Sequence, residues 1–568
     1  MMKFRLSCAA LLVSTATLAS AATAPDYSVL LHGGTIYDGM GGAPFVGDVA
    51  LNGDRIVYVG PQAPGTAAKT IEANGKAVSP GFINMLSWAI DSLIVDGRGM
   101  GDTAQGVTLE VFGEGNSMGP YTPAMKRLER SRQGDIKYPI TWTTLGQYLE
   151  MLQRKGVTPN VASFVGATTV RIHELGESDI DPTPQQLERM KALVRAAMKD
   201  GAMGVGSSMI YAPANYAETP ELVAITSEAG KCGGMYISHI RDEGPKLIEA
   251  IDELIRISAE SGAPAEIYHF KQSGRKNWEK IDAAIARVEA ARAGGQRITA
   301  DMYTYPASST GFDAAFPVWI QDGGLEAWVK RLKDPAQRAK AIAEMRGPSG
   351  TENADLVSHD PDKVILVGFK TDRLKPLTGK TLAEVAKDRG KAPDEVAADL
   401  IVEDGTRIQV VYFGQSEDNV RRHVGLPWMS FGSDGDSQAP EGVFLKSSTH
   451  PRSYGNFVRV IGKYARDEKA IGLPDAIRRL TSLPATNLGI KGRGVLMPGY
   501  YADVVIFDPA TVRDHATFAK PQQLATGVEQ VFVNGTQVWK DGKHTGAKPG
   551  RVVRGPGWTG WADGGACK

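Results

Sequence analysis

His239, His269 and Asp434 each stand at the end of a short, mostly apolar segment of this 568-residue chain. Two imidazoles and a carboxylate form a ligand set that can hold Zn2+ and leave one coordination position for water. A single buried histidine is more often a hydrogen-bonded packing residue than a ligand. Two histidines and an aspartate at matching positions favour a functional cluster instead, if the fold brings them together.

The segments around these residues are typical of a parallel α/β fold. Eight segments have strand character and alternate with helical stretches such as 184–199, 246–261 and 280–293, whose apolar residues recur at three- and four-residue spacing. This alternation predicts a TIM-type (β/α)8 barrel, in which the carboxyl ends of the strands form the active-site rim. The eight expected strands are 81–86, 107–112, 161–165, 203–208, 234–239, 265–270, 298–303 and 428–434.

The two ends of the chain contain short alternating segments and turn dipeptides such as Asn52-Gly53 and Asn534-Gly535. Neither end alone has enough strands to bury a sheet face, so we expect both ends to form one small β-sandwich domain. The expected parts are a signal peptide at 1–21, the β-sandwich at 22–79 and 490–553, the barrel at 80–489, a subdomain with a charged helix (326–346) inserted at 312–402, and a C-terminal tail at 554–568.

The first 21 residues have the features of a secretory signal peptide. Lys3 and Arg5 form a short positive region, an apolar run follows to Leu18, and Ala19-Ser20-Ala21 supplies the small residues of a cleavage site. The apolar run is shorter than the roughly 20 residues that a membrane-spanning helix needs. We therefore expect an exported protein, periplasmic or secreted, with no membrane insertion after the signal is removed.

Composition excludes several classes of function. The 64 lysines and arginines balance the 64 aspartates and glutamates, so no net charge attracts the chain to nucleic acid and no such partner is expected. Three cysteines, Cys8, Cys232 and Cys567, are too few for a four-cysteine zinc module or a disulfide scaffold. A disulfide between Cys232 and Cys567 could form after export, although their spacing gives no support for it.

A set of motifs between residues 27 and 553 follows one family pattern. The motifs are Ser79–Ile83, Gln105–Thr108, Ser207–Pro213, Ser238–Gly244, Ala300–Pro306, Gly432–Gly435, His450–Gly455 and Met497–Val505. Through them the chain resembles the N-acyl-D-amino-acid deacylases (D-aminoacylases) of the amidohydrolase superfamily. The resemblance implies a barrel with a β-sandwich built from both termini, and metal-dependent hydrolysis of the amide bond of an N-acyl amino acid. The expected partner is a small-molecule amide that carries a carboxylate.

The first departure from this family removes two metal ligands. The family's first strand normally ends in His-x-His, which binds one metal of the site, but Leu86 and Trp88 occupy those positions here. Leucine and tryptophan cannot ligate Zn2+, so a binuclear centre is not expected. One Zn2+ per chain is sufficient to activate a water for hydrolysis, and another divalent transition metal is the alternative.

The second departure follows the next strand, where these deacylases usually carry Gly-Asn-Cys-Gly with a cysteine ligand. Here the segment 112–117 has Gly115 opposite the cysteine when no gap is allowed, and Glu114 there after a shift of one residue. Glu114 is therefore predicted to join His239 and His269 as a metal ligand. Glu110, deeper in the strand, is the weaker candidate, and Glu114 could instead be a hydrogen-bonded residue of the rim.

The resemblance also implies roles around the metal. Asp434 matches the family's general base, which takes the proton of the water and passes it to the leaving amine. Lys271 and Arg452 occupy positions that the family uses to hold the substrate's α-carboxylate, and an arginine fork suits a carboxylate. The alternatives are a solvated loop lysine and a structural ion pair. The remaining predicted substrate contacts are Tyr211, Tyr305 and Ser308.

Other functions stay open at this point. The same site could hydrolyse a different amide, such as a dipeptide, a lactam or a xenobiotic amide. The missing His-x-His also allows a catalytically inactive binding protein that kept the fold. The triplet Arg241-Asp242-Glu243 is interpreted as an ion-pair cluster that supports His239, and not as a set of catalytic groups.

Overall fold

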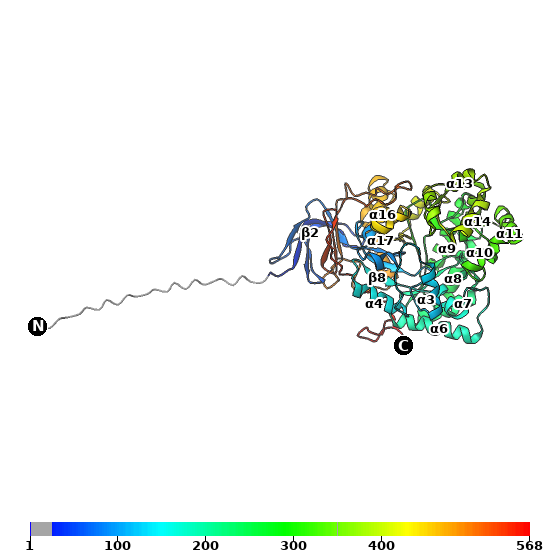
Figure 1. Cartoon of the computed structure of the whole chain (residues 1–568). Helices are drawn as coiled ribbons and strands as arrows, with labels where there is room; N and C mark the ends of the chain where they lie inside the picture. The colour runs from blue at the N-terminus through cyan, green and yellow to red at the C-terminus, as the bar shows by residue number, and fades with distance from the viewer. Residues whose placement is uncertain (2–24, 349, 568) are drawn as a thin grey trace.

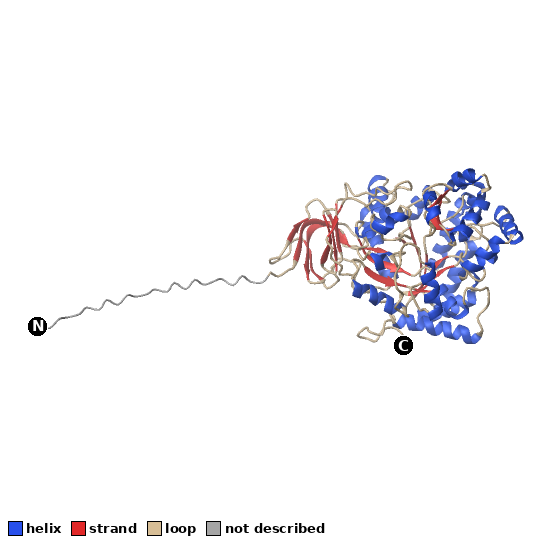
Figure 2. Ribbon diagram, in the orientation of Figure 1, coloured by secondary structure: helices blue, strands red, loops and turns tan. Residues whose placement is uncertain are grey.

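The computed structural model describes Met1, residues 25–348 and residues 350–567. Apart from Met1, the predicted signal peptide lies outside the described residues. A small domain of strands stands beside a larger body in which helices surround strands (Figure 1; Figure 2). Within the described ranges, no helix is both long and apolar enough to cross a membrane.

Eight parallel strands form the barrel, and each overlaps a segment that the sequence predicted. They are β6 (Phe82–Asn84), β7 (Val107–Phe112), β8 (Asn160–Ser163), β10 (Gly204–Ser208), β11 (Met235–His239), β12 (Ala265–Ile267), β13 (Ile298–Met302) and β17 (Met429–Phe431). A two-residue strand, β9 (Val165–Gly166), follows β8 and pairs with β10. The last and first barrel strands meet where Met85 N–H donates to the Phe431 carbonyl at 3.3 Å.

Helices cover the outside of the barrel, and three of them confirm the predicted ranges. These are α6 (Pro184–Lys199), α8 (Leu247–Ser261) and α9 (Ile281–Ala293). The other helices of this body are α1 (Ser92–Val95), α2 (Met100–Thr103), α3 (Pro123–Arg132), α4 (Leu145–Lys155), α5 (Ala167–Leu175), α7 (Thr219–Lys231), α15 (Glu417–Val424), α16 (Arg452–Arg459), α17 (Leu473–Leu480) and α18 (Ser482–Asn487).

Both ends of the chain contribute to one nine-stranded sheet, as expected for the small β-sandwich. The N-terminal strands are β1 (Val29–Ile36), β2 (Phe45–Asn52), β3 (Arg55–Gly60), β4 (Thr70–Glu72) and β5 (Ala77–Pro80). The C-terminal strands are β18 (Val504–Phe507), β19 (Val528–Val533), β20 (Thr536–Lys540) and β21 (Lys543–His544). The two sets join where β18 pairs antiparallel with β5. The side chains of β18 alternate between two hydrophobic cores. Val504 and Ile506 pack in the core of the sandwich, and Val505 and Phe507 pack in the larger core of the barrel.

The inserted segment has a sheet and a core of its own. Its strands β14 (Ser308–Gly311), β16 (Gln409–Tyr412) and β15 (Val364–Leu366) pair antiparallel, so the sheet extends beyond the expected limits of 312 and 402. Its helices are α10 (Leu325–Lys333), α11 (Pro335–Arg346), α12 (Glu352–His359), α13 (Leu382–Arg389) and α14 (Pro393–Asp404).

The expectation of one charged helix at 326–346 is wrong. The Asp334 side chain accepts hydrogen bonds from the N–H groups of Ala336 and Gln337, and Pro335 occupies the first helical position of α11. An N-cap followed by proline starts a new helix, so the segment forms α10 and α11.

The end of the chain, from Val553 onward, runs back along the barrel, and Gly555 N–H donates to the Gly201 carbonyl at 2.8 Å. Val553 N–H donates to the Val161 carbonyl at 2.8 Å, and the Val553 side chain joins the core inside the barrel. Cys567 forms a disulfide with Cys232, a residue that lies shortly before β11. The pairing that sequence spacing could not support is therefore present in the fold.

Glu266 on β12 makes stability depend on pH. Its neighbours Ala265 and Ile267 pack against the helices outside the barrel, so the alternation of side chains along the strand turns Glu266 into the barrel. The Glu266 side chain is fully buried there and accepts a hydrogen bond from Thr299 Oγ1 at 2.5 Å. Burial raises its pKa to about 7, from 4.5. A carboxyl with a raised pKa binds its proton more tightly in the folded state, so its contribution to stability is present below pH 4.5 and is lost as the pH rises toward 7.

We expect the free energy of unfolding of Glu266→Gln to lack this pH dependence, which amounts to up to about 3 kcal/mol at about 1.4 kcal/mol per pKa unit. Urea unfolding between pH 5 and 8 measures it. Glu289→Gln, on the exposed face of α9, is the control and should follow the wild-type profile. Parallel profiles for Glu266→Gln and the wild type would contradict the prediction.

Candidate metal centre and active site

Three predicted ligands meet at the carboxyl-terminal rim of the barrel. His239 is the last residue of β11, His269 follows β12 by two residues, and Glu114 follows β7 by two. Glu114 Oε1 lies 3.0 Å from His239 Nδ1 and 2.9 Å from His269 Nε2. One ligand atom from each residue lies within 4.8 Å of the others, and all three side chains are buried.

Glu110, the weaker candidate, does not reach this cluster. Its neighbours Leu109 and Val111 pack into the core inside the barrel, so alternation along β7 turns Glu110 outward. There its carboxylate accepts a hydrogen bond from Ser87 Oγ, and burial raises its pKa to about 7. Glu114 reaches the rim because it lies beyond the end of the strand, where the alternation no longer applies.

Glu243 faces both imidazoles on the side opposite Glu114. Its Oε1 lies 3.1 Å from His269 Nδ1 and its Oε2 lies 3.4 Å from His239 Nε2, so each ring has one nitrogen toward Glu114 and the other toward Glu243. Metal-binding histidines commonly direct their second nitrogen at a carboxylate, which orients the ring. Two nitrogens and one carboxylate oxygen, backed in this way, fit Zn2+.

The electrostatics of the cluster favour a cation. Burial and Lys271 oppose protonation of His269, but Glu114 and Glu243 outweigh them and raise its pKa to about 10. Burial would raise the pKa of Glu114, yet His269 and His239 hold it well below its usual range. The carboxylates thus favour a positive charge on His269, whereas burial lowers the pKa of His239. A metal ion held by these residues would supply that charge in place of the proton.

The backbone at two of these residues is left-handed. His269 has φ 35° and Asp434 has φ 49°, a region that non-glycine residues seldom adopt. Hydrogen bonds from His269 N–H to Asp301 Oδ1 (2.9 Å) and from Asp434 N–H to the Leu86 carbonyl (2.8 Å) hold the two residues there. Such strain, of order 1–3 kcal/mol per residue, is typical of functional sites because it aims a side chain where the regular backbone would not.

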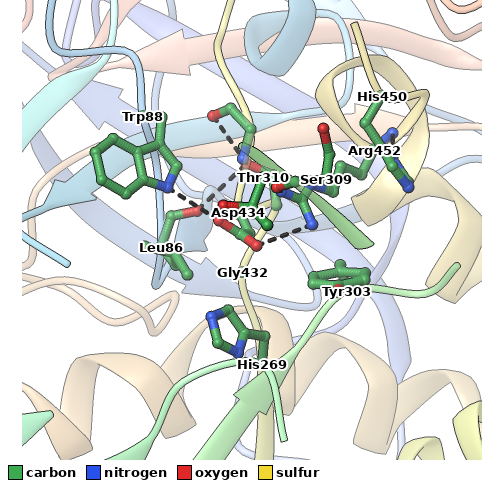
Figure 3. Close-up of polar contacts among 12 residues, drawn as sticks. Leu86, Trp88, His269, Tyr303, Ser309, Thr310, Gly432, Asp434, His450 and Arg452 are labelled. Atoms are coloured by element: carbon green, nitrogen blue, oxygen red, sulfur yellow. Dashed lines mark hydrogen bonds and ion pairs between the residues drawn. The ribbon is translucent and has the colours of Figure 1, made fainter. Parts of the chain in front are cut away.

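Asp434 has a hydrogen-bond partner or ion-pair partner on each oxygen. Its Oδ2 lies 2.8 Å from Arg452 Nη1, and its Oδ1 accepts a hydrogen bond of 2.9 Å from Trp88 Nε1 (Figure 3). Burial raises the pKa of Asp434, while Arg452 opposes that rise. Trp88 Nε1 also lies 3.1 Å from Glu114 Oε2, so the indole links the predicted base to the ligand cluster.

A cavity of about 1150 Å3 adjoins these residues, and its wall includes four of the five predicted substrate contacts. Those four are Lys271, Arg452, Tyr211 and Ser308. Tyr305 is not among the residues that line the cavity, and its hydroxyl donates to Asp514 Oδ2 at 3.3 Å, so a substrate contact by Tyr305 stays a prediction. Tyr303 takes its place in the wall, with the Arg452 guanidinium 4.4 Å from its ring centre.

Both cations of the site already have anionic partners. Lys271 Nζ lies 2.6 Å from Glu243 Oε1 and 2.6 Å from His269 Nδ1, so it is not the solvated lysine of the alternative interpretation. Arg452 pairs with Asp434, yet its buried Nε has no hydrogen-bond partner among the described residues. One guanidinium N–H of Arg452 is therefore unpaired within the described part of the chain, although that nitrogen is itself buried.

Sequence reasoning missed the contacts of Glu243 and Trp88. Glu243 belongs to the triplet interpreted as support for His239, and of that triplet only Glu243 contacts the imidazoles. Arg241 pairs with Glu253, and Asp242 accepts hydrogen bonds from backbone N–H groups at the start of α8. The position of Glu243 four residues after His239 was the available signal.

Comparison with known proteins gives consistent matches. The model of the amidohydrolase family matches residues 429–539. A D-aminoacylase from Alcaligenes xylosoxydans xylosoxydans is 31% identical over 535 residues, which cover 93% of this chain and 97% of the relative. A solved D-aminoacylase, studied for one-metal activation and second-metal attenuation at its binuclear centre, has a TM-score of 0.76 at 30% identity and covers 93% of this chain and 100% of its own.

An N-acyl-D-glutamate deacylase from Bordetella bronchiseptica, solved with zinc and a phosphonate inhibitor that mimics the tetrahedral intermediate, is also similar. Its TM-score is 0.75 at 27% identity, and the match covers 93% of this chain and 99% of that one.

We expect metal binding to require Glu114 and not Glu110. Glu114→Gln removes the charge with little change of shape, and should weaken zinc binding by at least the roughly 10- to 100-fold that loss of an outer-shell partner costs. Calorimetric titration of the metal-stripped protein with zinc measures this. Glu110→Gln is the matched control and should bind zinc as the wild type does. Weaker binding in the control alone would contradict the assignment.

Proposed function

Because this chain belongs to the D-aminoacylase family of the amidohydrolase superfamily, we propose that it hydrolyses the amide bond of an N-acyl amino acid with one metal ion per chain. The observation that carries the proposal is the buried set of Glu114, His239 and His269, with Asp434 in the same cavity wall. In this set the carboxylate of Glu114 takes the place of the cysteine that the family has. It therefore argues against an inactive protein that only kept the fold.

Glu114, His239 and His269 would hold the metal, and Zn2+ fits the donor set. When bound, Zn2+ supplies a Lewis acid for the scissile carbonyl and lowers the pKa of a water molecule. Glu243 keeps both imidazoles oriented from their outer edges, at 3.1 Å from His269 and 3.4 Å from His239.

Asp434 acts as the general base. Its burial raises its pKa, which makes the carboxylate a better proton acceptor than an exposed aspartate. The attacking water transfers a proton to Asp434 while its oxygen bonds to the amide carbon. Asp434 then passes that proton to the nitrogen as the C–N bond breaks, which releases the carboxylic acid and the amine.

Arg452 is the best placed group for the substrate's carboxylate. It lines the cavity, and its guanidinium lies beside Asp434, with Nη1 2.8 Å from Asp434 Oδ2. Lys271 adds positive charge beside Tyr303, although its ammonium group is engaged by Glu243. A carboxylated N-acyl amino acid suits this part of the wall better than an uncharged xenobiotic amide.

The proposed location is the periplasm or the exterior. The expected signal peptide motivates it, and the Cys232–Cys567 disulfide suits an oxidising compartment.

Asp434→Asn should keep the zinc content of the purified protein and lower kcat by about 10²- to 10⁴-fold, the usual contribution of a general base. Zinc analysis beside hydrolysis assays of N-acetyl-D-amino acids, N-acetyl-L-amino acids and dipeptides measures both quantities. His239→Ala should instead lose the metal together with the activity. Wild-type kcat in Asp434→Asn would refute the role of the base, and a wild-type protein that holds no transition metal would refute the proposed reaction.

A further inference from the structure

Trp88 lies between the carboxylates of Glu114 and Asp434, in the place where the family pattern has a metal-binding histidine. Its Nε1 is 3.1 Å from Glu114 Oε2 and 2.9 Å from Asp434 Oδ1. Figure 3 shows the indole directed at Asp434, with Arg452 on the other side of that carboxylate. One N–H group is thus shared by two negatively charged groups.

The backbone fixes this position of the indole. Trp88 N–H donates to the Gly435 carbonyl at 3.0 Å, and Asp434 N–H donates to the Leu86 carbonyl at 2.8 Å. The loop that carries the tryptophan and the loop that carries the aspartate are therefore hydrogen-bonded to each other in both directions. Rotation of the indole away from Asp434 would have to occur at its side chain alone, inside a partly buried pocket.

An indole N–H group and a metal ion interact differently with Glu114 Oε2 and Asp434 Oδ1. Two carboxylates that face one point repel each other unless a positive charge or a hydrogen-bond donor lies between them. The indole supplies a donor and has no acceptor atom, so it satisfies the carboxylates without being able to ligate a cation. Leu86, fully buried at the other lost histidine position, has no donor atom in its side chain either.

The hydrogen bond also decides which oxygen of Glu114 is available. Oε2 is engaged by Trp88, and Oε1 faces His239 Nδ1 and His269 Nε2. In the same way Asp434 has Oδ1 toward Trp88 and Oδ2 toward Arg452. The indole thus sets the orientation of both carboxylate planes.

We propose that the Trp88 indole N–H takes the place of a second cation: it holds Glu114 as a one-oxygen ligand, orients Asp434 and limits the centre to one metal ion. Trp88 is then a positioning residue that acts through Glu114 and Asp434. This inference rests on the proposed function only in taking Glu114, His239 and His269 as the ligand set.

The test is zinc titration of the metal-stripped full-length protein and its variants. The wild type should bind one equivalent of zinc. Trp88→Phe keeps an aromatic ring but removes the N–H group, and should bind one equivalent about 10- to 100-fold more weakly, as for loss of an outer-shell partner. Trp88→His returns a nitrogen ligand between the two carboxylates and should take up a second, weaker equivalent.

Trp142→Phe is the matched control. Its buried Nε1 has no hydrogen-bond partner among the described residues, and its ring packs against Tyr138 and Tyr148, away from the ligands. This variant therefore loses an indole N–H without losing a hydrogen bond. It should bind zinc with wild-type affinity, even if its thermal stability is reduced.

The outcomes separate this inference from the proposed function. Unchanged zinc affinity in Trp88→Phe, two tight equivalents in the wild type, or no second equivalent in Trp88→His would each overturn it while the hydrolase remained intact. A wild type that binds no zinc would overturn the proposed function. If the Trp88 variants fail to fold, a crystal structure of the zinc-loaded wild type decides: distances above 4 Å from Trp88 Nε1 to both carboxylates would overturn the inference, and distances near 3 Å would support it.

Discussion

A charge imbalance governs the active-site rim, because three carboxylates, two of them buried, meet there with two cationic side chains. Glu243 pairs with Lys271 at 2.6 Å, and Asp434 pairs with Arg452 at 2.8 Å. Glu114 has no lysine or arginine partner among the described residues and faces two imidazoles and an indole N–H group. Burial of an uncompensated charge is costly. His269, whose pKa is raised, therefore places a positive charge beside Glu114, and a divalent cation would meet the same requirement.

The rest of the fold serves to bring these charges together. Parallel strands deliver His239, His269 and Asp434 to one rim, and the left-handed backbone at His269 and Asp434 turns their side chains into the site. The inserted subdomain forms part of the cavity wall through β14, where Thr310 Oγ1 lies 2.8 Å from the Tyr211 hydroxyl. Charged groups gathered in this way in a restricted volume interact more strongly than they would in open solvent.

Sequence patterns predicted the elements that depend on local chemistry. All eight barrel strands were found because each is an apolar run bounded by turns, and the two-part sandwich was found because neither end could bury a sheet alone. The prediction of a single helix at 326–346 was wrong because the residues on both sides of Asp334-Pro335 follow a charged helical pattern. That pattern gave no sign that a second helix begins at Pro335. The resemblance pointed to Tyr305, whereas Tyr303 is the tyrosine in the cavity wall; both follow the end of β13 at Met302, where the alternation of side chains no longer indicates which residue faces the cavity.

The sequence by itself determined the types of the candidate metal ligands and the loss of the first-strand histidines, because those are properties of single positions in a family pattern. It also placed His239, His269 and Asp434 on one rim, since strand ends in a barrel lie together. Only the tertiary structure decided that Glu114 lies between the imidazoles, that Glu243 backs them, and that Trp88 links Glu114 to Asp434. Those contacts join loops that are far apart along the chain, and distances of about 3 Å between such loops depend on the packing of the whole barrel, which no local pattern encodes.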